Sequence, residues 1–431
     1  MSREENRKNF SKYVSQNILG MIGFSCYVLA DSYFISIAKG ADGLTALNLV
    51  MPLYSIIFSI GEMIGVGSAI RYAIGKIKKD ADADDYFWNA IIWCILSSIL
   101  FVFAGIFFSA DIMRVLGADE HIVAVGNNYT KIFMCFAPMF MCNYVTNAFV
   151  RNDGAPGIAM SATLFSSLFN IVFDYILMFP MNLGMEGAAL ATALSPIIGM
   201  GICSIHFFSK KSRVRLVVCK PSVRKLVAGC QLGVSAFVGE MSSAVITLAF
   251  NFVILKLAGN VGVAAYGVVA NIAIVTTAVF NGVAQGSQPL ISSCFGRGDK
   301  DGCTQLKRMG YTTAFVLAAV MYSILFIFAG QFVAVFNSEG SEMLRLYATE
   351  GVKLYFIGIF FAGINIVGGG AFSATEDAFK AAVVSVARGF VLILGAVFVM
   401  SALFGMTGVW LAYAVAEGIT TFIMLVMALR V

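Results

Sequence analysis

The sequence predicts an all-α polytopic membrane protein with about twelve transmembrane helices in two pseudo-symmetric six-helix lobes. Of its 431 residues, 59% are hydrophobic and only 12% are charged, with a mean hydropathy of +0.86. Soluble domains carry about 25% charged residues. The apolar runs last about 20 residues or more and do not alternate with polar residues, which favours membrane-spanning helices. An internal repeat, described below, divides the chain into two halves.

Twelve apolar windows, separated by charged, glycine or asparagine clusters, are the predicted spans. In the amino half they lie near 13–38, 44–73, 87–109, 122–149, 157–180 and 184–208. In the carboxyl half they lie near 226–258, 262–294, 309–333, 345–373, 378–402 and 406–430. We therefore expect an amino-terminal lobe over 1–209, a basic cytoplasmic linker over 210–225 and a carboxyl-terminal lobe over 226–431.

The distribution of basic residues predicts the orientation of these spans. Lysine and arginine precede span one, follow spans two and eight, and fill the segment "KKSRVRLVVCKPSVRK" between spans six and seven; Arg151 follows span four. The opposite loops, such as "SADIMRVLGADEH" and "FNSEGSEM", are acidic on balance. The positive-inside rule then places both termini in the cytoplasm of a multi-pass protein of the bacterial inner (cell) membrane. Topology also accounts for the net charge of +5, so no nucleic-acid partner is needed.

Three segment pairs indicate the internal repeat. "LFVFAG" at 100–105 recurs as "LFIFAG" at 325–330, "GMEGAALATAL" from Gly184 recurs as "GMTGVWLAYAV" from Gly405, and "FVRNDGAPGIAM" from Phe149 resembles "FSATEDAFKAAV" from Phe372. Because an even number of spans per half keeps both halves in one orientation, the repeat predicts two parallel lobes around a central cavity. Transporters use this arrangement.

Four polar residues in the amino half form a candidate cation site. Asp31 lies within the apolar stretch "CYVLADSYFIS", where an ionised carboxylate costs at least roughly 2.5 kcal/mol and is functional by default. Asn170 and Asp174 are four residues apart and share one helix face, and Thr192 lies in the following span. Their oxygens suit Na⁺, and a carboxylate suits H⁺. The alternatives are a structural role for Asp31 and Asp174 as partners of helix ends or of one another, an interhelical hydrogen bond for Asn170, and a bond from Thr192 to its own helix.

The carboxyl half does not copy these acids, since Asp31 aligns with Asn251 at a separation of 220 residues. Glu240 is a separate intramembrane carboxylate and a candidate for contact with a cationic substrate or a second ion. Other ionisable residues at membrane depth, which could simply pair with each other, are Glu62, Arg388 and Glu417. Glu376 and Asp377 lie at a predicted cytoplasmic span end, where solvated acids are ordinary.

Enzymatic chemistry has no visible residue set, so we predict no catalytic residues. The two histidines are far apart, no Ser/His or Cys/His pair is close in sequence, and neither metal-ligand spacing nor a Walker sequence is present. We expect no cofactor beyond a coupling ion, H⁺ or Na⁺, and no obligate protein partner. The expected partners are a small organic substrate and membrane lipid.

Over essentially its whole length the sequence resembles the multidrug and toxic compound extrusion (MATE) transporters. The resemblance rests on "LADSYFIS", "ALNLVMPL", the Asn170–Asp174 spacing followed by "GMEGAALAT", and "GVAQGSQPLISSCFGRGD" from Gly282. The "GSQP" segment is similar to the MepA-like bacterial branch. The resemblance implies cation-coupled antiport that exports organic, cationic amphipathic compounds or drugs by alternating access.

Two sets of family site residues fall on this chain. The amino-lobe cation site falls on Asp31, Asn170, Asp174 and Thr192. A span-seven glutamate and a span-ten acid used by another branch fall on Glu240 and Asp377. The alternative function is a lipid-linked precursor flippase of the related virulence-factor type. That function would require a large arginine-rich cavity for pyrophosphate, and only Arg388 and Arg71 lie at plausible depth.

Overall fold

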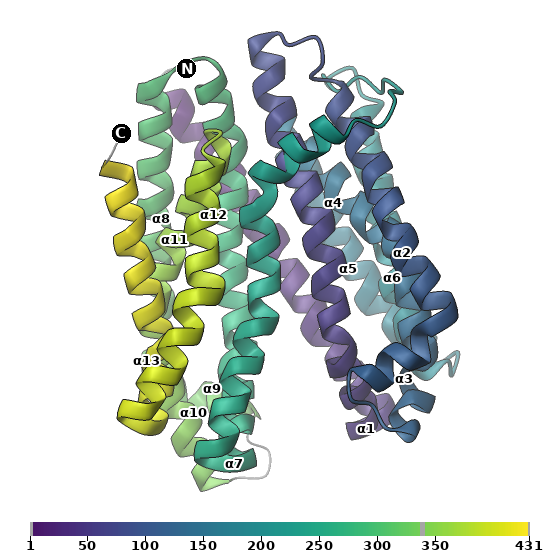
Figure 1. The fold of residues 1–431 in the computed structure, drawn as a ribbon, viewed down its shortest axis with the longest axis vertical. Helices are drawn as coiled ribbons and strands as arrows, with labels where there is room; N and C mark the ends of the chain where they lie inside the picture. Colours follow the sequence, from purple (N-terminus) through teal and green to yellow (C-terminus); the bar gives the residue numbers. More distant parts are fainter. Residues whose placement is uncertain (1–2, 337–340, 430–431) are drawn as a thin grey trace.

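The protein folds into long, nearly parallel helices in two adjacent groups (Figure 1). A computed structural model describes residues 3–336 and 341–429, and the described residues contain no strand. The amino half contains α1 (Arg3–Lys78), α2 (Asp85–Val115), α3 (Glu120–Cys135), α4 (Ala137–Asn152), α5 (Pro156–Met178) and α6 (Gly184–Phe207). The carboxyl half contains α7 (Val223–Gly296), α8 (Lys300–Ile327), α9 (Ala329–Phe336), α10 (Glu342–Tyr355), the 3₁₀ turn η1 (Phe356–Gly358), α11 (Ile359–Ala374), α12 (Ala378–Val386), the π-helical turn η2 (Ala387–Val391) and α13 (Leu392–Leu429).

Three of these helices are each two spans joined at a glycine. Gly40 in α1, Gly259 in α7 and Gly405 in α13 have φ of 60°, 61° and 59°, in the left-handed region that glycine adopts without steric cost. Helices α3 and α4 are bent by 46° relative to each other and together have the composition of one span. Each glycine-broken helix counts as two spans, whereas α3 with α4, α10 with α11, and α12 with the first part of α13 count as one span each. The described residues then contain twelve spans, as predicted.

The backbone also confirms the internal repeat. Residues with positive φ recur in the two halves at separations of 219 to 222 residues. The pairs are Gly40 with Gly259, Lys79 with Gly298, Gly154 with Glu376, and Gly184 with Gly405. The separation near Asp31 is 219, so its counterpart is Phe250 and not Asn251 as the sequence alignment indicated. The carboxyl half therefore carries an aromatic residue where the amino half carries the carboxylate.

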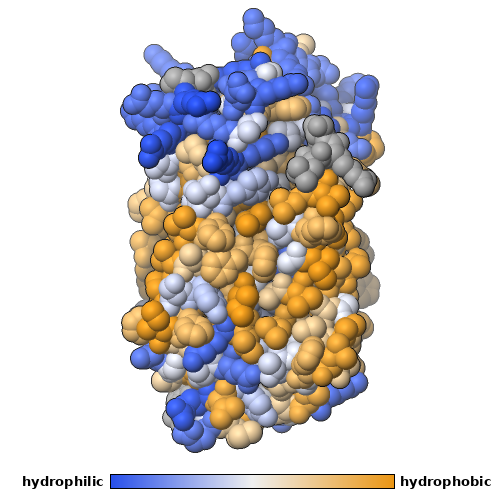
Figure 2. All heavy atoms as spheres, turned by 90° about the vertical axis from the view of Figure 1, so that its left-hand side faces the viewer, coloured by the Kyte–Doolittle hydropathy of each residue, from blue (hydrophilic) through white to orange (hydrophobic). Residues whose placement is uncertain are grey.

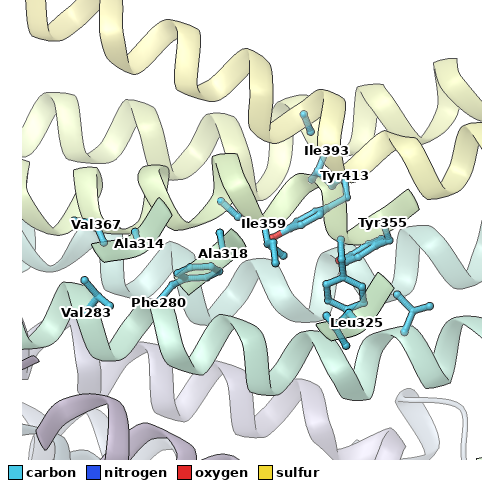
Figure 3. Packing of buried hydrophobic residues seen from close by; sticks show 14 of the residues in the cluster. Phe280, Val283, Ala314, Ala318, Leu325, Tyr355, Ile359, Val367, Ile393 and Tyr413 are labelled. Carbon is cyan, nitrogen blue, oxygen red and sulfur yellow. The ribbon is translucent and has the colours of Figure 1, made fainter. Parts of the chain in front are cut away.

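Each half has its own hydrophobic core. The largest cluster fills the carboxyl half between α7, α8, α10, α11 and α13 (Figure 3). Within it the rings of Tyr355 and Tyr413 stack with centroids 4.4 Å apart. Phe280 and Val283 of α7 pack beside Ala314 and Ala318 of α8 in the same cluster. This cluster also includes Phe10 and Val14 of α1, and the amino-half cluster includes Leu232 of α7, so the two cores meet where the lobes are in contact. The residue limits set for the lobes stay a prediction.

Close glycine contacts join the lobes at the end that carries both termini and the linker (Figure 1). A Cβ at Gly67 of α1 would lie 1.9 Å from the carbonyl oxygen of Gly229 of α7, and one at Gly233 would lie 2.0 Å from the Met63 oxygen. Gly286 of α7 approaches Val14 in the same way. The lobes are therefore in backbone contact at this end, and the molecule is closed there.

The linker is fastened to the amino lobe by a buried carboxylate. Asp153, just after α4, has no exposed side-chain surface, accepts a hydrogen bond from Tyr72 at 2.8 Å, and lies 2.8 Å from Nε2 of His206. It also accepts from the backbone N–H of Arg213 at 2.8 Å. Further along, the N–H of Ser222 donates to Asn89 at 2.7 Å. The linker is thus part of the amino lobe's surface.

A broad hydrophobic band crosses the face shown in Figure 2, between hydrophilic ends. Large apolar side chains such as Leu100, Phe107 and Ile327 are more than 60% exposed. In water such a surface would be costly, whereas hydrocarbon solvates it. The chain is a multi-pass membrane protein.

Candidate functional site

The four residues of the predicted cation site lie on three neighbouring helices of the amino lobe, and all four are buried. Asp31 comes from α1, Asn170 and Asp174 from α5, and Thr192 from α6. Asn170 and Asp174 are fully buried, and Asp31 is 7% exposed. The helical spacing that predicted one shared face for Asn170 and Asp174 therefore directs both side chains into the lobe.

Asn170 links the α5 carboxylate to α6. The side-chain amide of Asn170 has one orientation in which both its nitrogen and its oxygen form hydrogen bonds. In that orientation the nitrogen donates to Asp174 Oδ2 at 3.0 Å, and the oxygen accepts from the Thr192 hydroxyl at 3.2 Å. The interhelical hydrogen bond considered as an alternative for Asn170 is thus present, and it orients Asp174.

The two carboxylates keep unused ligand capacity. One oxygen each of Asp31 and Asp174 is buried without a hydrogen-bond partner in the protein, and the two groups are close enough for their charges to interact. Two buried, mutually repelling carboxylates are costly unless a proton or cation reaches them. These oxygens, with those of Asn170 and Thr192, fit a small cation or a shared proton.

Three tyrosines near this cluster were missed in the sequence analysis. Tyr27 precedes Asp31 by one helical turn, a spacing that could have revealed it. Tyr54 and Tyr129, from α1 and α3, share a hydrogen bond between their hydroxyls and lie near Asp31. Their proximity depends on helices that are distant in the chain, so no sequence pattern indicates it.

A cavity adjoins the cluster, with about 920 Å³ of empty space including the part open to solvent. Of the four predicted cation-site residues, Thr192 lines it. Most of the other lining residues come from the amino lobe, and Glu240 and Gln285 of α7 contribute from the carboxyl lobe. Aromatic rings line the cavity as well: Phe24, Tyr27, Phe58, Phe140 and Tyr144.

A polar network at the cavity joins the two lobes. Arg151 of α4 donates to the side-chain oxygen of Gln285 at 2.6 Å, and the Gln285 nitrogen donates to Glu62 of α1 at 3.4 Å. Arg151 is only 4% exposed. Its use as a loop cation in the orientation argument was therefore wrong, because it lies in the last turn of α4 and points inward.

Asp377 does not share the surroundings of Glu240. It caps α12, where its side chain accepts from the N–H of Lys380, and it pairs with the Lys380 ammonium at 3.1 Å; it is not among the residues that line the cavity. Its neighbour Glu376 pairs with Arg71 and Lys78 of α1 in the other lobe. That acid is an inter-lobe contact as well as a partly solvated group.

The remaining acid at membrane depth has a structural partner. Arg388, in the π-helical turn η2, donates to Glu417 of α13 at 2.6 Å, and Asn365 of α11 donates to the same carboxylate at 2.7 Å. Pairing between Arg388 and Glu417, one of the alternatives in the sequence analysis, is therefore confirmed.

The chain is similar to known transporters over nearly its whole length. The MatE family model matches residues 17–176 and 236–399. The multidrug export protein MepA of Staphylococcus saprophyticus is 26% identical over 410 residues, covering 93% of this chain and 89% of MepA. MepA of Staphylococcus aureus strain MRSA252 is 27% identical over 414 residues, with the same coverage.

Solved structures share the fold. A multidrug resistance MATE family transporter of the MOP superfamily, described in an outward-facing conformation, superposes with a TM-score of 0.92 at 20% identity over 99% of this chain and 96% of that one. A MOP superfamily transporter from Pyrococcus furiosus, described as having a binding pocket of reversed polarity, gives 0.91 at 19% identity over 99% and 95%.

Proposed function

Because the chain belongs to the MatE family, we propose that it is a secondary transporter that exports organic compounds in exchange for H⁺ or Na⁺. One observation carries this proposal: Asp31 of α1 and Asp174 of α5, each with a buried unpaired oxygen, interact with each other, and Asn170 links Asp174 to Thr192, which lines a cavity. Relatives named multidrug export proteins support compounds of varied structure as the cargo.

Cation binding at Asp31 and Asp174 supplies the coupling in this mechanism. A bound proton or Na⁺ cancels repulsion between the two groups, which lowers the cost of bringing α1 and α5 closer together. Thr192 contributes to both the cluster and the cavity wall. A rearrangement around Asn170 and Thr192 therefore alters the substrate cavity. The cavity then binds substrate with different affinities in the two conformations, and such a difference in affinity is what shifts a conformational equilibrium.

Alternating access follows from separation of the lobes at their glycine contacts. In the described state the end that carries the termini is closed, and we assign that end to the cytoplasm from its basic residues. Substrate leaves from the opposite side in this state. The carboxyl lobe and the amino lobe, with its fastened linker, then rock to open the cytoplasmic end.

The small number of arginines at the cavity disfavours the alternative function, that of a flippase for lipid-linked precursors. A pyrophosphate headgroup requires several guanidinium groups, and Arg151 is the one arginine among the residues lining the cavity. Arg388 and Arg71, the two arginines at plausible depth, pair instead with Glu417 and Glu376.

Transport by the purified chain in proteoliposomes tests the proposal. A pH gradient and a Na⁺ gradient are imposed separately, and movement of ethidium and other organic cations is followed. We expect one of the two gradients to drive transport, and Asp31→Asn and Asp174→Asn to abolish that transport. Asp301→Asn, at an exposed position at the start of α8, is the matched control and should remain active.

Full gradient-driven transport by either site variant would reject the role given to Asp31 and Asp174. If the wild-type chain responds to neither gradient, antiport is rejected and the flippase becomes the better hypothesis. Size-exclusion profiles of the variants distinguish loss of coupling from loss of folding.

A further inference from the structure

The linker between the lobes presents basic and apolar side chains together on the outside of the molecule. Residues 208–224 contain no acidic residue. Within the described part of the chain, five of their basic side chains are exposed and form no ion pair: Lys210, Lys211, Arg215, Lys220 and Arg224. Large apolar side chains beside them are 43% exposed or more: Phe208, Leu216, Val217, Val218 and Val223. An exposed apolar group of this size is a mark of an interaction surface.

The acids that follow α1 do not neutralise these five cations. Asp84 pairs with Lys76 at 2.8 Å. Lys225, at the start of α7, pairs with Asp85 and lies 3.5 Å from Asp82. These acids are therefore matched with cations outside residues 208–224, and the linker surface keeps its positive charge.

Hydrogen bonds hold this surface at the level where α2 begins. The backbone N–H of Arg215 donates to the Asp84 carboxylate at 3.2 Å, and the Cys219 thiol donates to the carbonyl oxygen of Asp85, the first residue of α2, at 3.6 Å. Val214 is buried in the amino-lobe core, so its neighbours in the chain are directed outward. Figure 1 shows the linker as a teal trace at the outer edge of the amino lobe.

The exposed apolar surface of α6 continues into the linker. Ile205, in the last turn of α6, is 64% exposed, and Phe208, just after the helix, is 81% exposed. Lys210 and Lys211 follow directly, so the surface changes here from apolar to basic. Side chains follow this order where a chain passes from hydrocarbon to the headgroup layer.

We propose that residues 208–224 are a binding surface for anionic phospholipids of the surrounding bilayer. The five unpaired cations contact the phosphate groups, and Leu216, Val217 and Val218 insert among the upper parts of the acyl chains. Clusters of roughly four to eight lysines and arginines next to a membrane span attract anionic lipids. Apolar side chains among the cations add contact with the acyl chains, which a nucleic acid or a soluble acidic protein would leave in water.

The inference goes beyond the proposed function, because it requires a membrane-embedded chain and makes no use of a cargo or a coupling ion. A tryptophan in the linker reports which lipid lies beside it. Val218→Trp is introduced into the full-length chain and reconstituted into vesicles of phosphatidylcholine with a minor share of phosphatidylglycerol. One of the two lipids carries bromine on its acyl chains, which quenches nearby tryptophan. The signal of the three native tryptophans, measured in the wild-type chain, is subtracted.

We expect both lipids to quench the new tryptophan, with phosphatidylglycerol enriched around it by about fivefold over its bulk share. That factor corresponds to the attraction of about 1 kcal/mol that one basic residue contributes at an anionic surface. Arg215→Gln with Lys220→Gln removes the cations that flank Val218 in the chain. This double change should abolish the enrichment while brominated phosphatidylcholine still quenches.

Arg297→Gln with Lys300→Gln is the matched control, because it removes two exposed charges from the segment between α7 and α8 and leaves the linker unchanged. Its enrichment should equal that of the chain with the native linker. If Val218→Trp does not fold, Val223→Trp, at a position that is 60% exposed, gives the same measurement.

Absence of quenching by either lipid would place the segment in water and overturn the inference. A shift of the tryptophan emission on adding polyglutamate to such unquenched protein would assign the surface to a soluble acidic partner instead. Equal enrichment with and without Arg215 and Lys220 would also overturn it. Because neither a gradient nor a substrate is present, this result is independent of whether the chain is an antiporter.

Discussion

A methyl group at Gly67 is expected to open the end of the molecule that carries the termini. A Cβ there would lie 1.9 Å from the Gly229 oxygen, whereas ordinary contact begins at 3.4 Å, so α1 and α7 must separate by about 1.5 Å. Both sides of this contact are backbone, which cannot rotate away. Overpacking of this kind costs about 1–3 kcal/mol, which corresponds to roughly a 5- to 150-fold shift away from the closed state.

A native cysteine reports this shift. Cys230 is next to Gly229 and packs, partly buried, against the core of the amino lobe. In Gly67→Ala, labelling of Cys230 by a membrane-permeant maleimide, quantified by mass spectrometry, should be faster by a factor in that range, because labelling follows the population of the open form. Cys303, buried inside the carboxyl lobe, should keep its wild-type rate.

Gly201→Ala is the matched control, because a Cβ at Gly201 of α6 meets no atom within 4 Å. Its Cys230 labelling should equal that of the wild-type chain. If Gly67→Ala also labels at the wild-type rate, backbone contact between the lobes at this point does not hold the described state closed. Faster labelling of Cys303 as well would indicate general unfolding and contradict the lobe-separation account.

Three further perturbations have directions fixed by the contacts described. Glu376→Gln removes the inter-lobe ion pairs with Arg71 and Lys78 and should also speed Cys230 labelling, but only severalfold, since partly exposed pairs contribute about 1 kcal/mol or less; an unchanged rate would mean that these pairs are not part of the closed state. Arg388→Met leaves the buried Glu417 carboxylate uncompensated and should lower the free energy of unfolding in detergent by about 3–5 kcal/mol, most of it regained with Glu417→Gln; equal stability of single and double variants would contradict the pairing. Asp153→Asn removes hydrogen-bond acceptor capacity for Tyr72, His206 and the linker, so trypsin should cleave the chain faster after Arg213. Cleavage at the wild-type rate would show that other contacts hold the linker.

Features set by local sequence were predictable, and features set by packing between distant segments were not. Hydropathy located the twelve spans because each depends on about 20 consecutive residues, and the repeat was visible in aligned segments. Asn170 and Asp174 were found as a pair because i, i+4 spacing puts side chains on one helix face. By contrast, the contact of Arg151 with Gln285 joins residues 134 positions apart, and the sequence analysis treated Arg151 as a loop cation.

The glycine breaks show the same distinction. The predicted gaps between spans, at 39–43 and 259–261, contain Gly40 and Gly259, but hydropathy does not indicate that the chain turns there through a positive φ at a single glycine. Their equivalence across the halves became clear only from backbone angles. The one-residue correction opposite Asp31, from Asn251 to Phe250, follows from those angles.

The burial of Asp153 bears on how the protein is made. Its partners Tyr72, His206 and Arg213 all precede the carboxyl lobe in the chain. As the ribosome releases the polypeptide from its amino end, the first six spans can therefore complete their own surface at the end that carries the linker before α7 enters the bilayer. The nascent first half then presents Gly67 and its neighbours as a finished platform on which the second half docks during biogenesis.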